Sequence, residues 1–236
     1  MTHALAQRLD AFARISPYDE TGIAQLTRVA RVVPPRRAPV GEGERPNFVH
    51  VIVDGWACRY KSLPDGRRQI VAFLLPGDLC DLNVYILKQM DHGIAAITRL
   101  SVADIAPDDM DALTANHPRI AQALWRETLI NQAVQREWTV NLGQRTASER
   151  IAHLLVELYL RLRTVGLARN ESCDFPPTQN DLASAAGLTA VHVNRTLQEL
   201  RRDGLIELER RRLTILDMRR LMDLAMFNPN YLHLHR

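Results

Sequence analysis

The chain has 236 residues, of which 46% are hydrophobic and 24% are charged. This balance is typical of a soluble globular protein and excludes a disordered or collagen-like chain. No apolar run approaches the roughly 20 residues needed to span a bilayer, and Met1–Asp10 lacks the apolar stretch of a signal peptide. We therefore expect a cytoplasmic protein with no membrane partner.

The basic residues are almost all arginine. The net charge is +3, and Lys61 and Lys88 are the only lysines among 30 basic residues. Arginine matches phosphates and guanine edges better than lysine does. A GC-rich genome produces the same bias, so the charge leaves a nucleic-acid partner open.

The first part of the chain predicts helices followed by many short strands. Between Leu5 and Val32, apolar residues recur every three or four positions, with a break at Ser16 and Pro17. This period is that of amphipathic helices. Turn signals then separate five β-type runs, which are Phe48–Val53, Trp56–Tyr60, Gln69–Leu74, Ile94–Thr98 and Val102–Ile105. Short strands at about ten-residue spacing predict a barrel or a sandwich.

A short helix over Asp108–Asn116 and a long one from Pro118 to Leu142 follow. At 1.5 Å per residue the long helix spans about 37 Å, which favours a connector or a dimerisation helix. A core helix of one protomer remains the alternative. One candidate seam has heptad spacing and consists of Leu124, Thr128, Asn131, Gln135, Trp138 and Leu142. The competing stripe consists of Ala123, Ile130, Ala133, Val134 and Val140.

The helical pattern breaks at Asn141–Arg145, so we place a hinge near Gly143. A new helix is predicted to begin at Thr146, because Glu149 stands at the spacing of a capping box. The polar stretch from residue 166 to residue 177 is predicted to be a loop.

The segment Gln179–Gln198 has the pattern of a helix-turn-helix. Such a motif needs a small residue where its two helices touch and a glycine at the turn. Ala183 occupies the contact position and Gly187 the turn. The predicted helices are Gln179–Ala186 and the recognition helix Ala190–Arg202.

The remaining positions of this segment fit the motif. The inward positions are apolar and comprise Leu182, Ala186, Leu188, Val193 and Leu197. The outward face of the second helix carries Ala190, Val191, His192, Asn194, Arg195 and Gln198. Asparagine and arginine read adenine and guanine edges, and Val191 can contact a thymine methyl. Thr178 and Thr189 are predicted to cap the two helices. A plain helical hairpin with Arg195 as a solvated charge is the alternative.

A basic hairpin follows the recognition helix. Leu205–Leu208 and Arg212–Leu216 predict two strands with arginines at their tip. Such a wing lies where it can meet phosphates, although an arginine run is also common in an ordinary solvated turn. The predicted DNA-binding residues are Gln179, Thr189, Val191, His192, Asn194, Arg195, Gln198, Arg210, Arg211 and Arg212.

Taken in this order, the segments resemble the Crp/Fnr transcription regulators from roughly Val32 to Leu216. The stretches that carry the resemblance are Val51–Ala57, Asp65–Ile70, Leu75–Asp78, Ser148–Ala152 and the helix-turn-helix. The resemblance implies an α+β fold with a jelly-roll-like β-roll sensor domain of the cyclic-nucleotide-binding type. It also implies a long dimerisation helix and a winged helix-turn-helix domain, over residues 1–107, 108–145 and 146–236.

The resemblance further implies a sequence-specific DNA-binding regulator. A homodimer would bind a two-fold symmetric site in double-stranded DNA, with half-sites about 34 Å apart. RNA polymerase would be a partner if the protein is an activator. Family members often read DNA through the position of Arg195, with support from those of Val191 and Asn194. The family often has glutamate where Val191 stands, so we expect a different half-site.

Departures from the family pattern argue against cyclic AMP. Members that bind it carry a glutamate for the ribose and an arginine for the phosphate after the Pro-Gly-Asp turn. Here Asp81 is shorter, and no arginine lies between Arg68 and Arg99, so only Lys88 could pair with the anion. An unpaired anion in a semi-buried pocket is costly. The candidate effector pocket comprises Gly77, Asp78, Cys80, Asp81, Asn83, Lys88, Thr128 and Asn131. We expect weak or no cyclic AMP binding, and either an unidentified small-molecule effector or none.

We predict no cofactor, no metal site and no enzymatic activity. Oxygen-sensing relatives hold an iron–sulfur cluster on N-terminal cysteines, whereas the first cysteine here is Cys58. The chain lacks the common catalytic and phosphate-binding motifs. Cys80 is expected to be buried, and Cys173, in a polar stretch, to be exposed and oxidisable. The alternative function is a small-molecule sensor module whose helical pair does not bind DNA.

Overall fold

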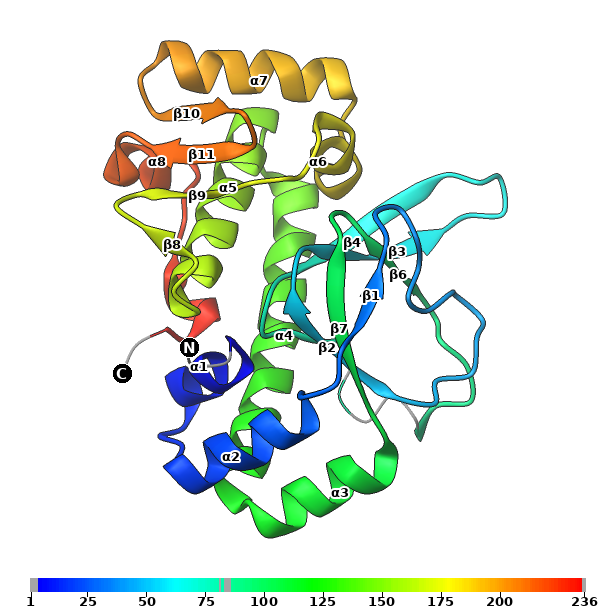
Figure 1. Ribbon diagram of the computed structural model, residues 1–236. Coiled ribbons are helices and arrows are strands. Elements are labelled where there is room, and N and C mark those ends of the chain that lie inside the picture. Colours follow the sequence, from blue (N-terminus) through cyan, green and yellow to red (C-terminus); the bar gives the residue numbers. More distant parts are fainter. Residues whose placement is uncertain (1–3, 81, 83–85, 235–236) are drawn as a thin grey trace. The chain divides into compact units, whose positions relative to one another are not determined.

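The computed structural model describes residues 4–80, 82 and 86–234 (Figure 1). The chain divides into two compact units, an N-terminal unit up to Gln132 and a C-terminal unit over Ala133–His233. The three-part domain division made from the sequence stays a prediction. Among the described residues, no helix has both the length and the apolar character needed to cross a membrane.

The N-terminal unit begins with two short helices, α1 (Ala4–Phe12) and α2 (Pro17–Leu26). Ser16 and Asp19 form a capping box at the start of α2, which explains the break between the helices. The prediction of helix as far as Val32 is wrong, because β1 (Arg31–Val33) pairs with a later strand and buries Val33.

The strands of this unit form a β-roll of two antiparallel sheets. The remaining strands are β2 (Val49–Asp54), β3 (Ala57–Ser62), β4 (Arg68–Leu74), β5 (Leu79–Cys80), β6 (Gly93–Ala96) and β7 (Leu100–Ile105). The sheet orders are β1-β7-β2-β5 and β4-β3-β6. One apolar cluster takes residues from both sheets, including Ile52 and Leu74, so the sheets pack face to face. All five predicted strand runs are confirmed, as is the α+β fold class.

Gly55 makes the turn between β2 and β3 possible. Its φ is +87°, in the region that favours glycine. A Cβ there would lie 2.3 Å from the Arg99 carbonyl oxygen. The Asp54-Gly55 signal in the sequence therefore reflects both the backbone conformation and a close approach of another loop.

Two helices follow the β-roll, α3 (Pro107–Asn116) and α4 (Pro118–Gln144). A second apolar cluster joins α1, α2, α3 and the first turns of α4 to one face of the sheet that contains β2 and β7. The predicted interruption from Asn141 is wrong, because α4 continues through Gly143 and ends at Gln144 rather than at Leu142.

Each of the two predicted seams of α4 is buried in part within the protomer. The residues of the two stripes that are buried within the protomer are Ala123, Leu124, Ile130, Ala133, Val134 and Trp138. The large apolar side chains exposed on α4 are Trp125 (67%) and Leu129 (61%), which lie outside both stripes, and Val140 (45%) and Leu142 (38%), which belong to them. The buried residues belong to the cores of the two units, so the sequence periodicity reports intramolecular packing.

The C-terminal unit contains the end of α4, α5 (Ala147–Thr164) and the elements that follow. These are β8 (Ala168–Arg169), β9 (Ser172–Asp174), α6 (Gln179–Ala186), α7 (Ala190–Arg202), β10 (Ile206–Glu209), β11 (Arg212–Ile215), α8 (Met218–Leu224) and the 3-10 helix η2 (Pro229–Leu232). Thr146 and Glu149 form the predicted capping box of α5. The four strands form one antiparallel sheet in the order β10-β11-β9-β8.

The prediction of a loop from residue 166 to residue 177 is wrong in part, because β8 and β9 extend the sheet there. Cys173 lies on β9 opposite Leu213 and is 2% exposed. Burial, with Asp174 nearby, raises the pKa of its thiol to about 12. The expected exposed, oxidisable thiol is therefore wrong, and Cys58 and Cys80 are buried as well.

A buried histidine lies in the core of the C-terminal unit. His153 on α5 is 0% exposed, and its Nε2 lies 3.3 Å from Glu137, whose carboxylate binds Arg145. Phe227 and Tyr231 cover its ring. Burial, together with the charge of Arg145, lowers the pKa of His153 to about 3.

We expect this histidine to reduce stability as the pH falls below its ordinary pKa of 6.5. Between pH 6.5 and 3 the unfolded chain binds a proton that the folded chain does not, so the free energy of unfolding decreases with falling pH. From about pH 7.5 to about pH 5 the expected loss is about 2 kcal/mol. Urea unfolding at both pH values, with His153→Gln as the control, measures it. An equal loss in the control would assign the effect to other groups.

Candidate nucleic-acid interface

The helix-turn-helix forms at the predicted residues. Thr178 and Asp181 make a capping box at the start of α6, and Thr189 Oγ1 accepts a hydrogen bond from the His192 N–H at 3.2 Å. Gly187 ends α6 with a φ of +62°. This left-handed conformation lets the chain reverse between the helices, so both helices and both caps are confirmed.

The two faces of the motif differ as the sequence pattern predicted. Four of the five inward positions are buried and Leu188 is half-buried. The outward residues of α7 that are exposed are Val191, His192, Arg195 and Gln198, whereas Ala190 and Asn194 are half-buried. Thr189 and Gln179 are exposed at the first turns of α7 and α6. Val191 is 79% exposed, so its side chain is accessible to a partner.

Arg195 projects from the middle of α7. Its side chain is 65% exposed, and its Nε lies 3.9 Å from Glu199 Oε1, one turn further along the helix. Glu199 also contacts Ser148 at 3.5 Å. A distance of 3.9 Å is too long for a hydrogen bond, so Glu199 leaves the forked donors of Arg195 available for a base edge.

The wing lies beside the recognition helix. In Figure 1, α7 and the hairpin of β10 and β11 lie side by side in orange. Arg201 donates from Nη2 to the Leu208 carbonyl at 3.0 Å, which braces α7 against β10. No sequence pattern signals this brace, because both partners look like ordinary surface residues of separate elements.

The three arginines of the wing have different roles in the hairpin. Arg210 and Arg211 form its two-residue turn, with φ values of +47° and +62°. A left-handed residue other than glycine or asparagine costs roughly 1–2 kcal/mol, so the turn is strained where it presents two cations. Arg212 begins β11, and its guanidinium contacts Ser172 at 2.8 Å and Asp174 at 3.5 Å.

We expect Arg210 and Arg211, rather than Arg212, to supply phosphate contacts. Replacing both by alanine should weaken DNA binding uniformly across sequences. The logarithm of the binding constant should also fall less steeply with the logarithm of the salt concentration. The slope should decrease by about one unit for each phosphate that the protein no longer neutralises. The measurement is a titration of DNA at several salt concentrations. Arg212→Ala is the matched control and should change the slope less. A changed base preference would mean instead that the wing reads sequence.

The candidate effector residues are placed as follows. Asp78 is buried, Lys88 is exposed, and Thr128 and Asn131 are half-buried on α4. Gly77 packs against α1, since a Cβ there would lie 2.8 Å from the Ala4 carbonyl oxygen. Cys80 is buried in the β-roll core. Asp81 and Asn83 lie outside the described residues.

An arginine that the sequence analysis missed joins part of this set. Arg8 on α1 is 5% exposed and makes ion pairs with Asp78 at 2.9 Å and Glu127 at 2.7 Å. Asn131 donates to the same Glu127 oxygen at 3.3 Å. Burial opposes the charge of Arg8, but the two carboxylates outweigh it and raise the pKa of the guanidinium. The carboxylate of the Pro-Gly-Asp turn is thus paired inside the protomer.

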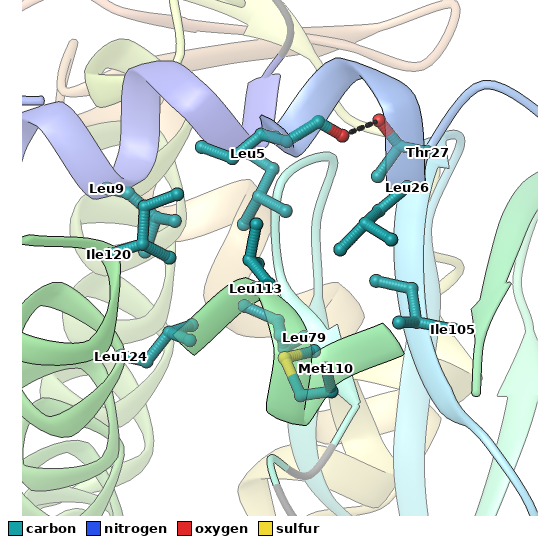
Figure 2. Close-up of a pocket in the computed structure, with 11 residues that line it drawn as sticks. Leu5, Leu9, Leu26, Thr27, Leu79, Ile105, Met110, Leu113, Ile120 and Leu124 are labelled. Atoms are coloured by element: carbon teal, nitrogen blue, oxygen red, sulfur yellow. Dashed lines mark hydrogen bonds between the residues drawn. The ribbon is translucent and has the colours of Figure 1, made fainter. Parts of the chain in front are cut away.

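The cavity beside this group offers nothing polar to a ligand. Figure 2 shows it between α1, α2, α3 and α4, lined by leucine, isoleucine and methionine side chains. Its one polar lining residue, Thr27, donates its hydroxyl to the Ile23 carbonyl at 2.8 Å. The void is about 10 Å³, which is smaller than the space a ligand would need and apolar enough to stay dry.

Comparison with known proteins agrees with this geometry. Residues 149–224 match the Crp-like helix-turn-helix domain, and residues 30–117 match the cyclic nucleotide-binding domain. The transcriptional activatory protein AadR of Rhodopseudomonas palustris is 29% identical over 95% of this chain and 92% of its own. The structure of FixK2 from Bradyrhizobium japonicum superposes with a TM-score of 0.74 at 28% identity, over 85% of this chain and 99% of that one.

The transcriptional activator protein FnrL of Cereibacter sphaeroides is 31% identical over 190 residues, which are 79% of this chain and 76% of FnrL. In this chain, the β-roll and the winged helix-turn-helix both lie within the matched families. The chain therefore belongs to the Crp/Fnr family of DNA-binding transcription regulators.

Proposed function

We propose that two copies of this chain bind a two-fold symmetric DNA site, with α7 of each copy in the major groove. The observation that carries the proposal is the exposed face of α7, where Val191 and Arg195 stand beside Asn194. Arginine pairs bidentately with guanine, asparagine pairs with adenine, and valine contacts a thymine methyl. The half-site should therefore contain a guanine flanked by A·T pairs.

Selection of bound sequences from a random DNA pool, with purified protein and no added ligand, tests this proposal. Enrichment of an inverted repeat is the expected result, because each copy presents one capped recognition helix and one wing. A single, unrepeated motif would contradict the dimeric mode of binding. Binding without any enrichment would contradict sequence readout by α7.

We propose that the dimer seam centres on Trp125 and Leu129. These two large apolar side chains lie one turn apart on α4 and are 67% and 61% exposed. Two large apolar side chains that lie next to each other on one helix face are unfavourable in water unless a partner covers them. A second copy of α4 would bury both pairs in a self-complementary contact.

Replacing Trp125 and Leu129 by glutamate is expected to yield a monomer. Four carboxylates would face one another across the two-fold axis, whereas the monomer would gain only exposed charge. Light scattering should give the 26.8 kDa of one chain in place of twice that mass. Val29→Glu is the matched control, since Val29 is 74% exposed in the same unit but lies outside α4. A dimer that survives the double substitution would place the seam elsewhere.

We further propose that the protein activates transcription in the cytoplasm with RNA polymerase as its partner, since FnrL and AadR are activators. We propose that cyclic AMP is not the effector. The Arg8 ion pairs engage the Asp78 carboxylate from within the chain, and no arginine lies between Arg68 and Arg99 to receive a cyclic phosphate. We retain the division into a sensor part (1–107), a dimerisation helix (108–145) and a DNA-binding part (146–236).

A further inference from the structure

The chain continues past the part that matches the helix-turn-helix family, which ends at residue 224. The following residues up to His233 are built into the C-terminal unit. Phe227 is 8% exposed, Leu232 is 2% exposed and Ala225 is fully buried. A solvated tail would not bury apolar side chains in this way, so the segment has a structural partner.

One carboxylate joins this segment to two helices. Glu157 on α5 is 0% exposed. Both of its oxygens lie 3.1 Å from Trp138 Nε1 on α4, and Oε2 accepts the Tyr231 hydroxyl at 2.9 Å. Arg161 adds an ion pair at 3.4 Å. Burial raises the pKa of Glu157, and these donors and the arginine oppose the rise. A buried carboxylate with several donors holds them in one arrangement.

A second set of contacts joins the same segment to the connection between α4 and α5. Arg145 stands directly after α4, and its Nε donates to the Ala225 carbonyl at 3.1 Å. Its Nη2 donates to the Met226 carbonyl at 3.4 Å and pairs with Glu137 on α4 at 2.6 Å. Only Arg145 and Thr146 separate the two helices, so these bonds fall where the chain could otherwise bend.

We propose that residues 225–233 form a clamp that fixes the last turns of α4 against α5 and so sets the angle at which α7 is presented to DNA. The clamp residues act by positioning and need not touch DNA. The inference rests on the proposed dimeric binding, because a fixed angle between α4 and α7 matters most when two recognition helices must meet two half-sites at once. Loosening the clamp should widen the range of half-site spacings that the dimer accepts.

The test is the double variant Trp138→Phe, Tyr231→Phe, which removes the two donors that join Glu157 to α4 and to the C-terminal segment, leaves the Arg161 contact within α5, and keeps an aromatic ring at each position. Binding is measured on the selected inverted repeat, on repeats with one base pair added or removed at the centre, and on a single half-site. We expect about a tenfold loss of affinity for the selected repeat and weaker discrimination between spacings. Affinity for the single half-site should stay unchanged. Tyr159→Phe is the matched control, because it removes the hydroxyl of a buried tyrosine on α5.

Hydrogen exchange decides the proposal independently of DNA. The wild-type amides of residues 137–149 should be protected, and the double variant should exchange them at least about tenfold faster while α6 and α7 keep their protection. Unchanged exchange and unchanged spacing discrimination would each overturn the clamp. Failure of the wild-type protein to select any repeat would overturn the proposed function, and the exchange result would still decide the clamp.

Discussion

Replacing Arg195 by alanine is expected to abolish preferential binding to the selected DNA site while leaving the fold and the dimer intact. The side chain is 65% exposed and its only close charged neighbour is Glu199 at 3.9 Å, among the described residues, so its removal leaves no cavity. A bidentate arginine–guanine contact gives about 1–3 kcal/mol of discrimination. Two such contacts per dimer correspond to a decrease of roughly 30-fold to 10⁴-fold in affinity for the selected site.

The measurement is a titration of the selected site and of a scrambled site, with secondary structure and molecular mass recorded in parallel. Arg195→Lys is the matched control. Lysine keeps the charge but lacks the planar fork, so that variant should retain the salt dependence and lose most of the selectivity. Unchanged affinity of Arg195→Ala for the selected site would contradict the assignment of α7 as the reading element.

The helix-turn-helix could be predicted from the sequence because its determinants are local. Gly187 is required by a left-handed turn, and Thr178 and Thr189 cap the helices that follow them within three residues. The apolar period of α7 then determines which face is outward, which placed Arg195 and Val191 on it. These caps and turns depend on the backbone geometry of residues that are close together in the sequence, so they can be predicted without knowing the tertiary contacts.

The proposed dimer seam could not be predicted in the same way. Helical periodicity shows which side chains of α4 are apolar, but it does not separate those that pack within a unit, such as Ile130 and Trp138, from those that stay exposed, such as Leu142. Trp125 and Leu129 stand out only once α1 and α2 have covered the opposite side of α4's first turns. Which apolar face remains exposed is decided by contacts far apart in the sequence, and no local pattern encodes them.

Long-range polar contacts escaped prediction for the same reason. Arg8 and Glu127 are 119 residues apart in the chain, and Tyr231 and Glu157 are 74 apart. Each of these side chains, taken alone, is typical of a solvated helix face. Cys173 was misjudged because its polar neighbours suggested a loop, whereas alternation along β9 turns the thiol inward and its neighbours outward.

Replacing Arg8 by methionine is expected to destabilise the N-terminal unit by about 3–5 kcal/mol, the usual consequence of leaving a buried charge without its partner. The substitution keeps an apolar stem of similar length but leaves the carboxylates of Asp78 and Glu127 inside the protein. Urea unfolding measures the effect. Arg31→Met is the matched control, because Arg31 pairs with Asp104 at a more exposed position and should cost less than about 1 kcal/mol.

A compensated variant separates charge from packing. When Arg8→Met is combined with Asp78→Asn and Glu127→Met, no unpaired charge remains, and most of the stability should return. Recovery would mean that the three groups depend on one another electrostatically, and that Arg8 neutralises the carboxylate of the Pro-Gly-Asp turn. A triple variant as unstable as Arg8→Met would instead show that the arginine stem is required for packing between α1 and α4. In that case apolar packing would determine where α1 lies, and the ion pair between Arg8 and Asp78 would follow from that position.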